Sequence, residues 1–163
     1  MKLYRLHQTQ LLPIPLPMAW DFFSDPANLP LITPPDLGFR IISPLPERMY
    51  AGMIVSYTVT PFAGLPVTWV SEITHAEEPR FFVDEQRIGP YRFWHHQHLF
   101  RQLAEGTEMT DLVHYGLPFD PMSRVVAPWV RRRLAKIFAY RRQALEQRFG
   151  RREKESSTIR LPG

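Results

Sequence analysis

The longest regular pattern of hydrophobic positions lies near the carboxyl end of the chain, over residues 120–149. It begins with Asp120 and Pro121, which are typical of a helix start because aspartate caps helix N-termini and proline suits the first turn. Apolar residues then recur at spacings of three, four or seven, and so fall on one helix face: Val126, Val130, Leu134, Ile137, Phe138, Leu145 and Phe149. The pattern predicts one long helix whose remaining surface is mostly basic, with Arg131, Arg132, Arg133, Lys136, Arg141, Arg142 and Arg148.

The residues before this helix show patterns typical of short strands. Residues 52–60 alternate strictly between apolar and polar side chains, which predicts a strand with one buried face. Further strands are predicted at 2–12, 39–42, 67–75, 80–88, 91–103 and 107–117. Gly89–Pro90 and Glu105–Gly106 are tight-turn signals, so the strands that they connect are expected to be antiparallel.

Two short helices, at residues 15–24 and 26–31, are predicted between the first strand and the second. The order is therefore a strand, two short helices, about six more strands and a long helix. We expect an α+β fold in which a curved antiparallel sheet of about seven strands wraps around the C-terminal helix. Such a sheet closes poorly at its open edge, so a cavity between helix and sheet is expected, and concave apolar cavities are the usual ligand sites.

Length, composition and charge limit the classes of protein to which the chain can belong. The 163 residues favour one domain, predicted over residues 1–149, followed by a flexible basic and polar tail at 150–163. The absence of cysteine excludes disulfides and thiolate chemistry. No apolar run is long enough for a transmembrane helix, and the first residues lack a signal-peptide pattern, so we expect a cytoplasmic protein. Residues 121–163 carry a net charge of +9 and residues 1–120 carry −5, so the basic character belongs to the helix and tail.

Several polar residues are predicted to meet on one face of the last three strands. A turn at Gly89–Pro90 pairs Glu85 with Trp94, and a turn at Glu105–Gly106 pairs Asp111 with Phe100 and Tyr115 with His96. With these pairings, the shared face carries Glu85, His96, His98, Asp111 and Tyr115.

Three interpretations of this polar group remain open. A His-x-His pair can chelate a metal ion, but a third ligand at fixed spacing is missing, so we expect no metal and no cofactor. A histidine beside a carboxylate and a tyrosine can act as acid and base on a carbonyl substrate. The simplest interpretation is a polar network whose members satisfy one another. Our working hypothesis is a polar spot in an apolar pocket that orients the head group of a ligand.

Aromatic residues are frequent, at 13% of the chain, and we expect many of them to line that pocket. The predicted ligand-contacting residues outside the polar group are Tyr57, Trp69, Trp94, Phe100, Leu134 and Phe138. The sequence does not decide which face of residues 80–117 points toward the pocket, because both faces carry apolar residues.

The order of elements and several motifs resemble a known superfamily. The motifs are Thr33-Pro34-Pro35, Gly64-Leu65-Pro66, Phe82-Val83-Asp84-Glu85-Gln86, Gly89-Pro90-Tyr91, the set Trp94, His96, His98 and Phe100, and the run from Thr107 to Phe119. The chain resembles the SRPBCC superfamily, which joins START lipid-transfer domains, aromatic polyketide cyclases and plant allergens, and within it a small bacterial branch. The resemblance covers about residues 2–149 and implies the helix-grip fold.

The resulting hypothesis is a protein that binds a hydrophobic small molecule or lipid, as a carrier or sensor. An enzyme resembling polyketide cyclases or dehydratases is the alternative, and a regulatory interaction module is a third class. The basic helix suggests transient contact with an anionic membrane. Nucleic-acid binding is not expected, because the arginines at 131–133 spread around the helix rather than forming one stripe.

Overall fold

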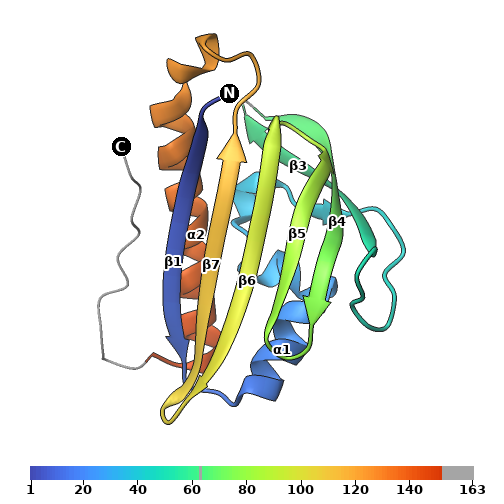
Figure 1. Cartoon of the computed structure of the whole chain (residues 1–163), viewed down its shortest axis with the longest axis vertical. Coiled ribbons are helices and arrows are strands. Elements are labelled where there is room, and N and C mark those ends of the chain that lie inside the picture. Colours follow the sequence, from blue (N-terminus) through green and yellow to red (C-terminus); the bar gives the residue numbers. More distant parts are fainter. Residues whose placement is uncertain (63, 152–163) are drawn as a thin grey trace.

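The structure is a computed structural model that describes residues 1–62 and 64–151. It contains one seven-stranded antiparallel sheet, with the strands in the order β1-β7-β6-β5-β4-β3-β2 (Figure 1). The strands are β1 (Leu3–Leu12), β2 (Arg40–Ile41), β3 (Ile54–Phe62), β4 (Leu65–Glu77), β5 (Phe81–Ile88), β6 (Phe93–Leu103) and β7 (Gly106–Gly116). The tail predicted at 150–163 lies almost wholly outside the described residues.

Helices cover one face of this sheet. They are α1 (Leu16–Ser24), the 3-10 helices η1 (Pro26–Ile32), η2 (Pro35–Leu37) and η3 (Met122–Arg124), and the long α2 (Ala127–Phe149). Helix α2 lies along β1 and β7, and α1 lies across one end of the sheet (Figure 1). The structure therefore confirms the predicted α+β helix-grip fold, with two short helices after the first strand.

The start of the long helix was predicted wrongly. Helix α2 begins at Ala127 rather than Asp120, and Val126 is its N-cap. Asp120 does not cap the helix, because its carboxylate binds the guanidinium of Arg124 at 2.8 Å and lies 3.4 Å from the amino group of Met1. The intervening residues form η3 instead of the first turns of α2.

The sheet bends at β4, where its register shifts against β5 at two places, between Val70 and Ser71 and between Ile73 and His75. Extra residues of this kind bend a strand and increase its twist. The bend turns β4 and β3 toward the helices, so the sheet curves around the space beside α2.

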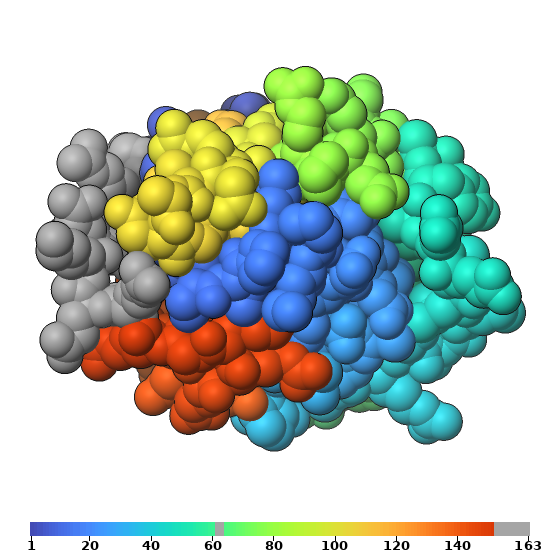
Figure 2. Space-filling view, turned by 90° about the horizontal axis from the view of Figure 1, so that it is seen from below, coloured from blue at the N-terminus to red at the C-terminus, as the bar shows by residue number. Residues whose placement is uncertain are grey.

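Two apolar clusters fill the space between sheet and helices. One surrounds α1 and includes Trp20, Phe23, Phe100 and Leu145. The other lies under the first half of α2 and includes Leu6, Val113, Val130, Leu134 and Phe138. Figure 2 shows α1 between the β6–β7 end of the sheet and the carboxyl end of α2, so α1 covers this end of the molecule.

Buried polar residues separate the two clusters. Gln8 and Gln10 of β1 point toward α2, and their amide groups donate hydrogen bonds to the backbone carbonyls of Phe138 and Arg142, at 3.3 and 3.1 Å. In the neighbouring strand β7, Asp111 pairs with Gln8. A polar layer thus crosses the middle of the core, where the candidate site lies.

Candidate functional site

A cavity of about 200 Å³ lies between α2, the curved sheet and the segment α1–η1. Most of its wall is apolar, and aromatic side chains dominate it. The aromatic lining consists of Phe22, Phe23, Phe39, Tyr57, Trp69, Phe82, Tyr91, Trp94 and Phe138. Much of the remaining apolar wall consists of Leu134 and Ile137 of α2 and of Val55 and Ile73 of the sheet.

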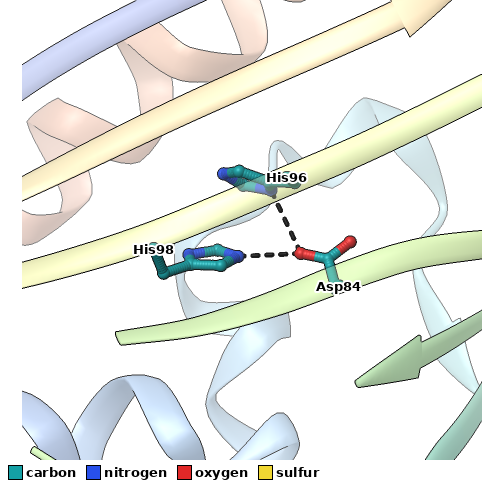
Figure 3. A group of neighbouring side chains, drawn as sticks. All are labelled: Asp84, His96 and His98. Carbon is teal, nitrogen blue, oxygen red and sulfur yellow. Dashed lines mark hydrogen bonds and ion pairs between the residues drawn. The ribbon is translucent and has the colours of Figure 1, made fainter. Parts of the chain in front are cut away.

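One part of the wall is polar and charged. Asp84 of β5, His96 and His98 of β6, and Arg141 of α2 all line the cavity. Alternate residues of a strand point to the same face, so His96 and His98 both face inward, and Asp84 opposes His96 in the neighbouring strand. Figure 3 shows the three side chains of the sheet pointing toward one another.

Two aspartates and two histidines form a closed ring of short contacts. Oδ2 of Asp84 lies 3.2 Å from Nδ1 of His96 and 2.8 Å from Nε2 of His98. Oδ1 of Asp111 lies 2.9 Å from Nε2 of His96 and 3.3 Å from Nδ1 of His98. The imidazole rings lie side by side, with 3.8 Å between their centroids. Asp111 does not line the cavity, so it closes the ring from behind.

Arg141 completes this group from the helix side. Its Nη2 lies 3.4 Å from Oδ1 of Asp111 and 3.4 Å from Nδ1 of His98, and its guanidinium lies 5.4 Å from the ring centre of Phe23. The side chain is only 8% exposed. The prediction that Arg141 belongs to the solvent-facing surface of the helix is therefore wrong, because its spacing from Phe138 and Leu145 places it in the buried stripe.

The contacts define where the protons lie. Each ring nitrogen of both histidines lies near a carboxylate, but Nδ1 of His98 also lies 3.4 Å from the donor Nη2 of Arg141, which favours a neutral His98 with its hydrogen on Nε2. Because the pKa of His96 is raised and that of His98 is lowered, we assign the positive charge of the pair to His96. Two carboxylates, one imidazolium and one guanidinium then sum to zero charge. Charge balance of this kind is what makes a buried ionic group tolerable.

Burial and neighbouring charges shift the pKa values of these groups. For both carboxyl groups, burial acts to raise the pKa, but favourable charges outweigh it. His96 with His98 lowers the pKa of Asp84, and Arg141 with the two histidines lowers that of Asp111. Burial acts to lower the pKa of His96, yet the two carboxylates raise it overall. Burial and the charge of His96 lower the pKa of His98.

A second polar group lies on β3 and β4. The hydroxyl of Ser71 accepts a hydrogen bond from Nε1 of Trp69 at 3.1 Å and shares another, also 3.1 Å long, with the hydroxyl of Tyr57. Burial, together with the charge of Asp84, raises the pKa of Tyr57, so its hydroxyl stays protonated. Nε1 of Trp94 donates to Oδ1 of Asp84 at 3.2 Å. These bonds hold three aromatic rings of the lining in fixed orientations.

The predicted register between the strands at 80–88 and 91–103 is wrong by one residue. Glu85 pairs with His95 rather than Trp94, because residues 89–92 connect the strands instead of a two-residue turn. A slip of one residue exchanges the two faces. Glu85 therefore lies on the outer face, where it contacts His95 at 2.7 Å and Arg87 at 3.2 Å, and Asp84 takes the inner position.

The predicted register between the last two strands is wrong by two residues. Asp111 pairs with His98 and Tyr115 with Trp94, because the turn contains residues 104 and 105. A shift of two residues preserves the face, so the prediction that His96, His98 and Asp111 share a face is confirmed.

The structure places the predicted ligand-contacting residues in three groups. Those that line the cavity are Tyr57, Trp69, Trp94, His96, His98, Leu134 and Phe138. Phe100 is buried beside Trp20, Tyr115 is buried against Tyr4, and Asp111 lies behind the histidines. Glu85 faces away. Sequence reasoning missed Asp84, Ser71 and Arg141, although Asp84 is in phase with the apolar Phe82.

No helix in the described part of the chain is long and apolar enough to cross a membrane.

Comparison with known proteins agrees with the fold. The family model described as polyketide cyclase/dehydrase and lipid transport matches residues 12–139. Protein Ms6760 from Mycobacterium smegmatis is 19% identical, with a TM-score of 0.62 over 88% of this chain and 92% of that one. A START superfamily protein from the same organism is 12% identical, with a TM-score of 0.68 over 90% and 97%.

A further solved structure contains a similar fold within a much longer chain. The nucleoside-diphosphate sugar epimerase from Corynebacterium glutamicum is 23% identical, with a TM-score of 0.58, and the match covers 87% of this chain and 28% of that one. A search of curated proteins finds no match. The family model identifies the family of the chain, and the solved structures identify its fold.

Proposed function

Because the chain belongs to the polyketide cyclase/dehydrase and lipid-transport family, we propose that it binds a hydrophobic small molecule or lipid in the cavity beside α2. It acts as a carrier or sensor of that molecule in the cytoplasm, and residues 1–149 form the binding domain. The observation that carries the proposal is the aromatic cavity of about 200 Å³ whose wall carries the charged group of Asp84, His96, His98 and Arg141. Such a wall fits a ligand with an apolar body and one polar end.

The apolar body supplies most of the affinity in this proposal. Burial of apolar surface stabilises a complex by about 25 cal/mol per Å². The polar end lies against Asp84, His98 and Arg141, which offer both an acceptor and donors. The guanidinium of Arg141 supports this placement, because the side chain lines the cavity and carries hydrogen-bond donors.

Native mass spectrometry of the protein purified from its own host, followed by solvent extraction, tests the proposal. We expect a co-purifying lipid or aromatic compound that adds a defined mass. Leu134→Trp, which fills the cavity, should abolish the added mass. Leu99→Trp, on the outer face of β6, is the matched control and should retain it. A clean apo mass for the wild type, together with no uptake of added fatty acids or aromatic compounds, would contradict the proposal.

A second candidate function is acid–base catalysis of the cyclase or dehydratase type. The favouring observation is the Asp84–His98 pair, 2.8 Å apart and on the cavity wall. A carboxylate that orients a histidine is the usual arrangement for moving a proton at a substrate carbon or oxygen. This candidate predicts that His98→Gln abolishes turnover of a bound polyketide-like substrate and leaves its affinity within about threefold. A carrier would show no turnover in either protein.

The cavity also requires a route by which a lipid enters it, and we propose an anionic membrane surface as the partner. Large apolar side chains are unusually exposed between β7 and the first turn of α2, namely Phe119, Met122, Val125, Val126 and Trp129. Arg132 and Lys136 are exposed on the adjoining turns of the helix. An apolar tip beside basic side chains matches the acyl chains and anionic head groups of a bilayer surface.

A further inference from the structure

We propose that Asp84, His96 and His98 form a binding site for one divalent transition-metal ion, of which zinc is the representative, on the wall of the cavity. The sequence shows only the His-x-His pair; the structure adds a carboxylate from the neighbouring strand. The proposal goes beyond ligand carriage and does not depend on it, because metal binding can be measured without any organic molecule.

The geometry of the three side chains suits a small cation. One atom from each residue, Oδ2 of Asp84, Nδ1 of His96 and Nε2 of His98, can serve as a ligand, and the ligand atoms of the group lie within 4.8 Å of one another. The separations from Asp84 are 3.2 and 2.8 Å. Zinc bonds of about 2.0–2.2 Å at tetrahedral angles place ligand atoms roughly 3.4 Å apart. Small side-chain rotations therefore bring all three atoms to bonding distance.

Asp111 occupies the position of an outer partner for both histidines. Histidines that bind metals usually donate their second ring N–H to a carboxylate or carbonyl, which fixes the ring orientation. Oδ1 of Asp111 lies 2.9 Å from Nε2 of His96 and 3.3 Å from Nδ1 of His98, the nitrogens that face away from Asp84. With the other nitrogens on the metal, both rings can donate to the same carboxylate. Arg141 holds this carboxylate in place from α2.

The site opens toward the cavity. Asp84, His96 and His98 line the cavity, whereas Asp111 lies behind them. Three protein ligands with an open fourth position are typical of catalytic rather than structural metal sites. The open position faces the aromatic lining, so an oxygen of a bound molecule can become the fourth ligand.

Charge decides which oxygen is preferred. Metal binding displaces the proton from Nδ1 of His96. With both imidazoles neutral, Asp84, Asp111 and Arg141 carry a net charge of −1, which favours a divalent cation. The loaded site then carries +1 in a low-dielectric surrounding. It should favour a carboxylate, an enolate or a strongly polarised carbonyl oxygen over a neutral alcohol.

Titration of the chelator-treated, full-length protein with Zn²⁺ and Co²⁺ tests the site. We expect one ion per chain by calorimetry and intense visible absorption bands of four-coordinate Co²⁺. Asp84→Asn and His98→Gln should each weaken binding at least 100-fold. Asp111→Asn should weaken it about 10- to 100-fold. Glu85→Gln, next to Asp84 but on the outer face, is the matched control and should leave it unchanged.

His95 and Glu85 on the outer face could also bind a metal ion, so the experiment includes His95→Gln. Loss of binding in His95→Gln and Glu85→Gln but not in Asp84→Asn would overturn the proposal, as would absence of stoichiometric binding to the wild type. If an inner-face variant does not fold, paramagnetic shifts in Co²⁺-loaded wild type decide instead. Shifted ring protons of His96 and His98 support the site, and shifted ring protons of His95 alone refute it.

Discussion

Nη2 of Arg141 in α2 lies 3.4 Å from Oδ1 of Asp111 in β7, and both side chains are buried, at 8% and 2% exposure. This ion pair joins the helix to the middle of the sheet. It also supplies the positive charge that allows Asp111 to remain ionised beside a second carboxylate, Asp84. The stability of the fold and the charge of the cavity wall are therefore linked through one residue of α2.

Removal of Arg141 alone should destabilise the protein strongly. Arg141→Met keeps the apolar stem and removes the charge, which leaves Asp111 buried without its guanidinium partner. Breaking a buried ion pair in this way costs about 3–5 kcal/mol. We expect a loss of that size in the free energy of unfolding, measured by urea denaturation at neutral pH. Arg132→Met, on the exposed face of the same helix, should change the value by less than about 0.5 kcal/mol.

The double variant Arg141→Met/Asp111→Asn separates charge from packing. If the cost of Arg141→Met comes from the uncompensated carboxylate, the double variant should recover part of the lost stability. Equal or greater loss in the double variant would show that Arg141 acts through its packing against Phe23 instead.

The stability of the metal-free protein should depend on pH with a maximum near the ordinary histidine pKa of about 6.5. His98 has a lowered pKa in the folded protein, so stability falls as pH drops below that value. It falls again below about pH 4, because Asp84 and Asp111 also have lowered pKa values. His96 has a raised pKa in the folded protein. It therefore stabilises the fold below about pH 6.5, and this stabilisation is lost as pH rises through the pKa of His96 in the folded protein.

Urea denaturation between pH 3 and pH 9 measures this profile. Asp111→Asn removes one titrating carboxylate and one partner of His96, so it should flatten both sides of the maximum. A wild-type profile that rises steadily from pH 6 to pH 9 would contradict the assignment of His96 as an imidazolium ion.

Much of this arrangement could be predicted from the sequence, since apolar periodicity and turn residues specify the order of elements. The register between strands could not, because it depends on where each turn begins. The connection between β5 and β6 shifts the register by one residue relative to a two-residue turn at Gly89–Pro90, and this shift exchanges Glu85 for Asp84 on the inner face. A carboxylate stands at either position, so composition alone does not distinguish them.

The burial of Arg141 could not be predicted from the sequence for a different reason. Its position fits the buried stripe of α2, yet an arginine among other arginines is typical of a solvent-exposed face. Only the acceptors on the facing strands, Asp111 and His98, make its burial favourable. Asp111 lies 30 residues and His98 lies 43 residues before Arg141 in the chain, so no local pattern indicates the contact.

Ser71 should contribute to stability through the two aromatic side chains that it holds. Ser71→Ala removes the acceptor of the Trp69 indole and the partner of the Tyr57 hydroxyl, and an unsatisfied buried group costs about 1–3 kcal/mol. Tyr57→Phe removes only one of these bonds and leaves Ser71 with the other. We expect Ser71→Ala to lower the free energy of unfolding more than Tyr57→Phe. A larger loss in Tyr57→Phe than in Ser71→Ala would indicate that the hydrogen bond from Trp69 contributes little to stability.

The exposed apolar tip should bind anionic membranes. Val125 is 86% exposed, and burial of such a side chain in the bilayer interface stabilises the bound state by about 1.5–3 kcal/mol. We expect the wild type to sediment with vesicles that contain phosphatidylserine, and Val125→Asp to reduce binding roughly tenfold or more. Met18→Asp is the control, because Met18 is 51% exposed but lies on α1, at the opposite end of the molecule (Figure 1). The basic residues Arg132 and Lys136 should make binding weaker at high salt. Equal binding of wild type and Val125→Asp, or equal binding to neutral phosphatidylcholine vesicles, would exclude the tip as an anionic membrane contact.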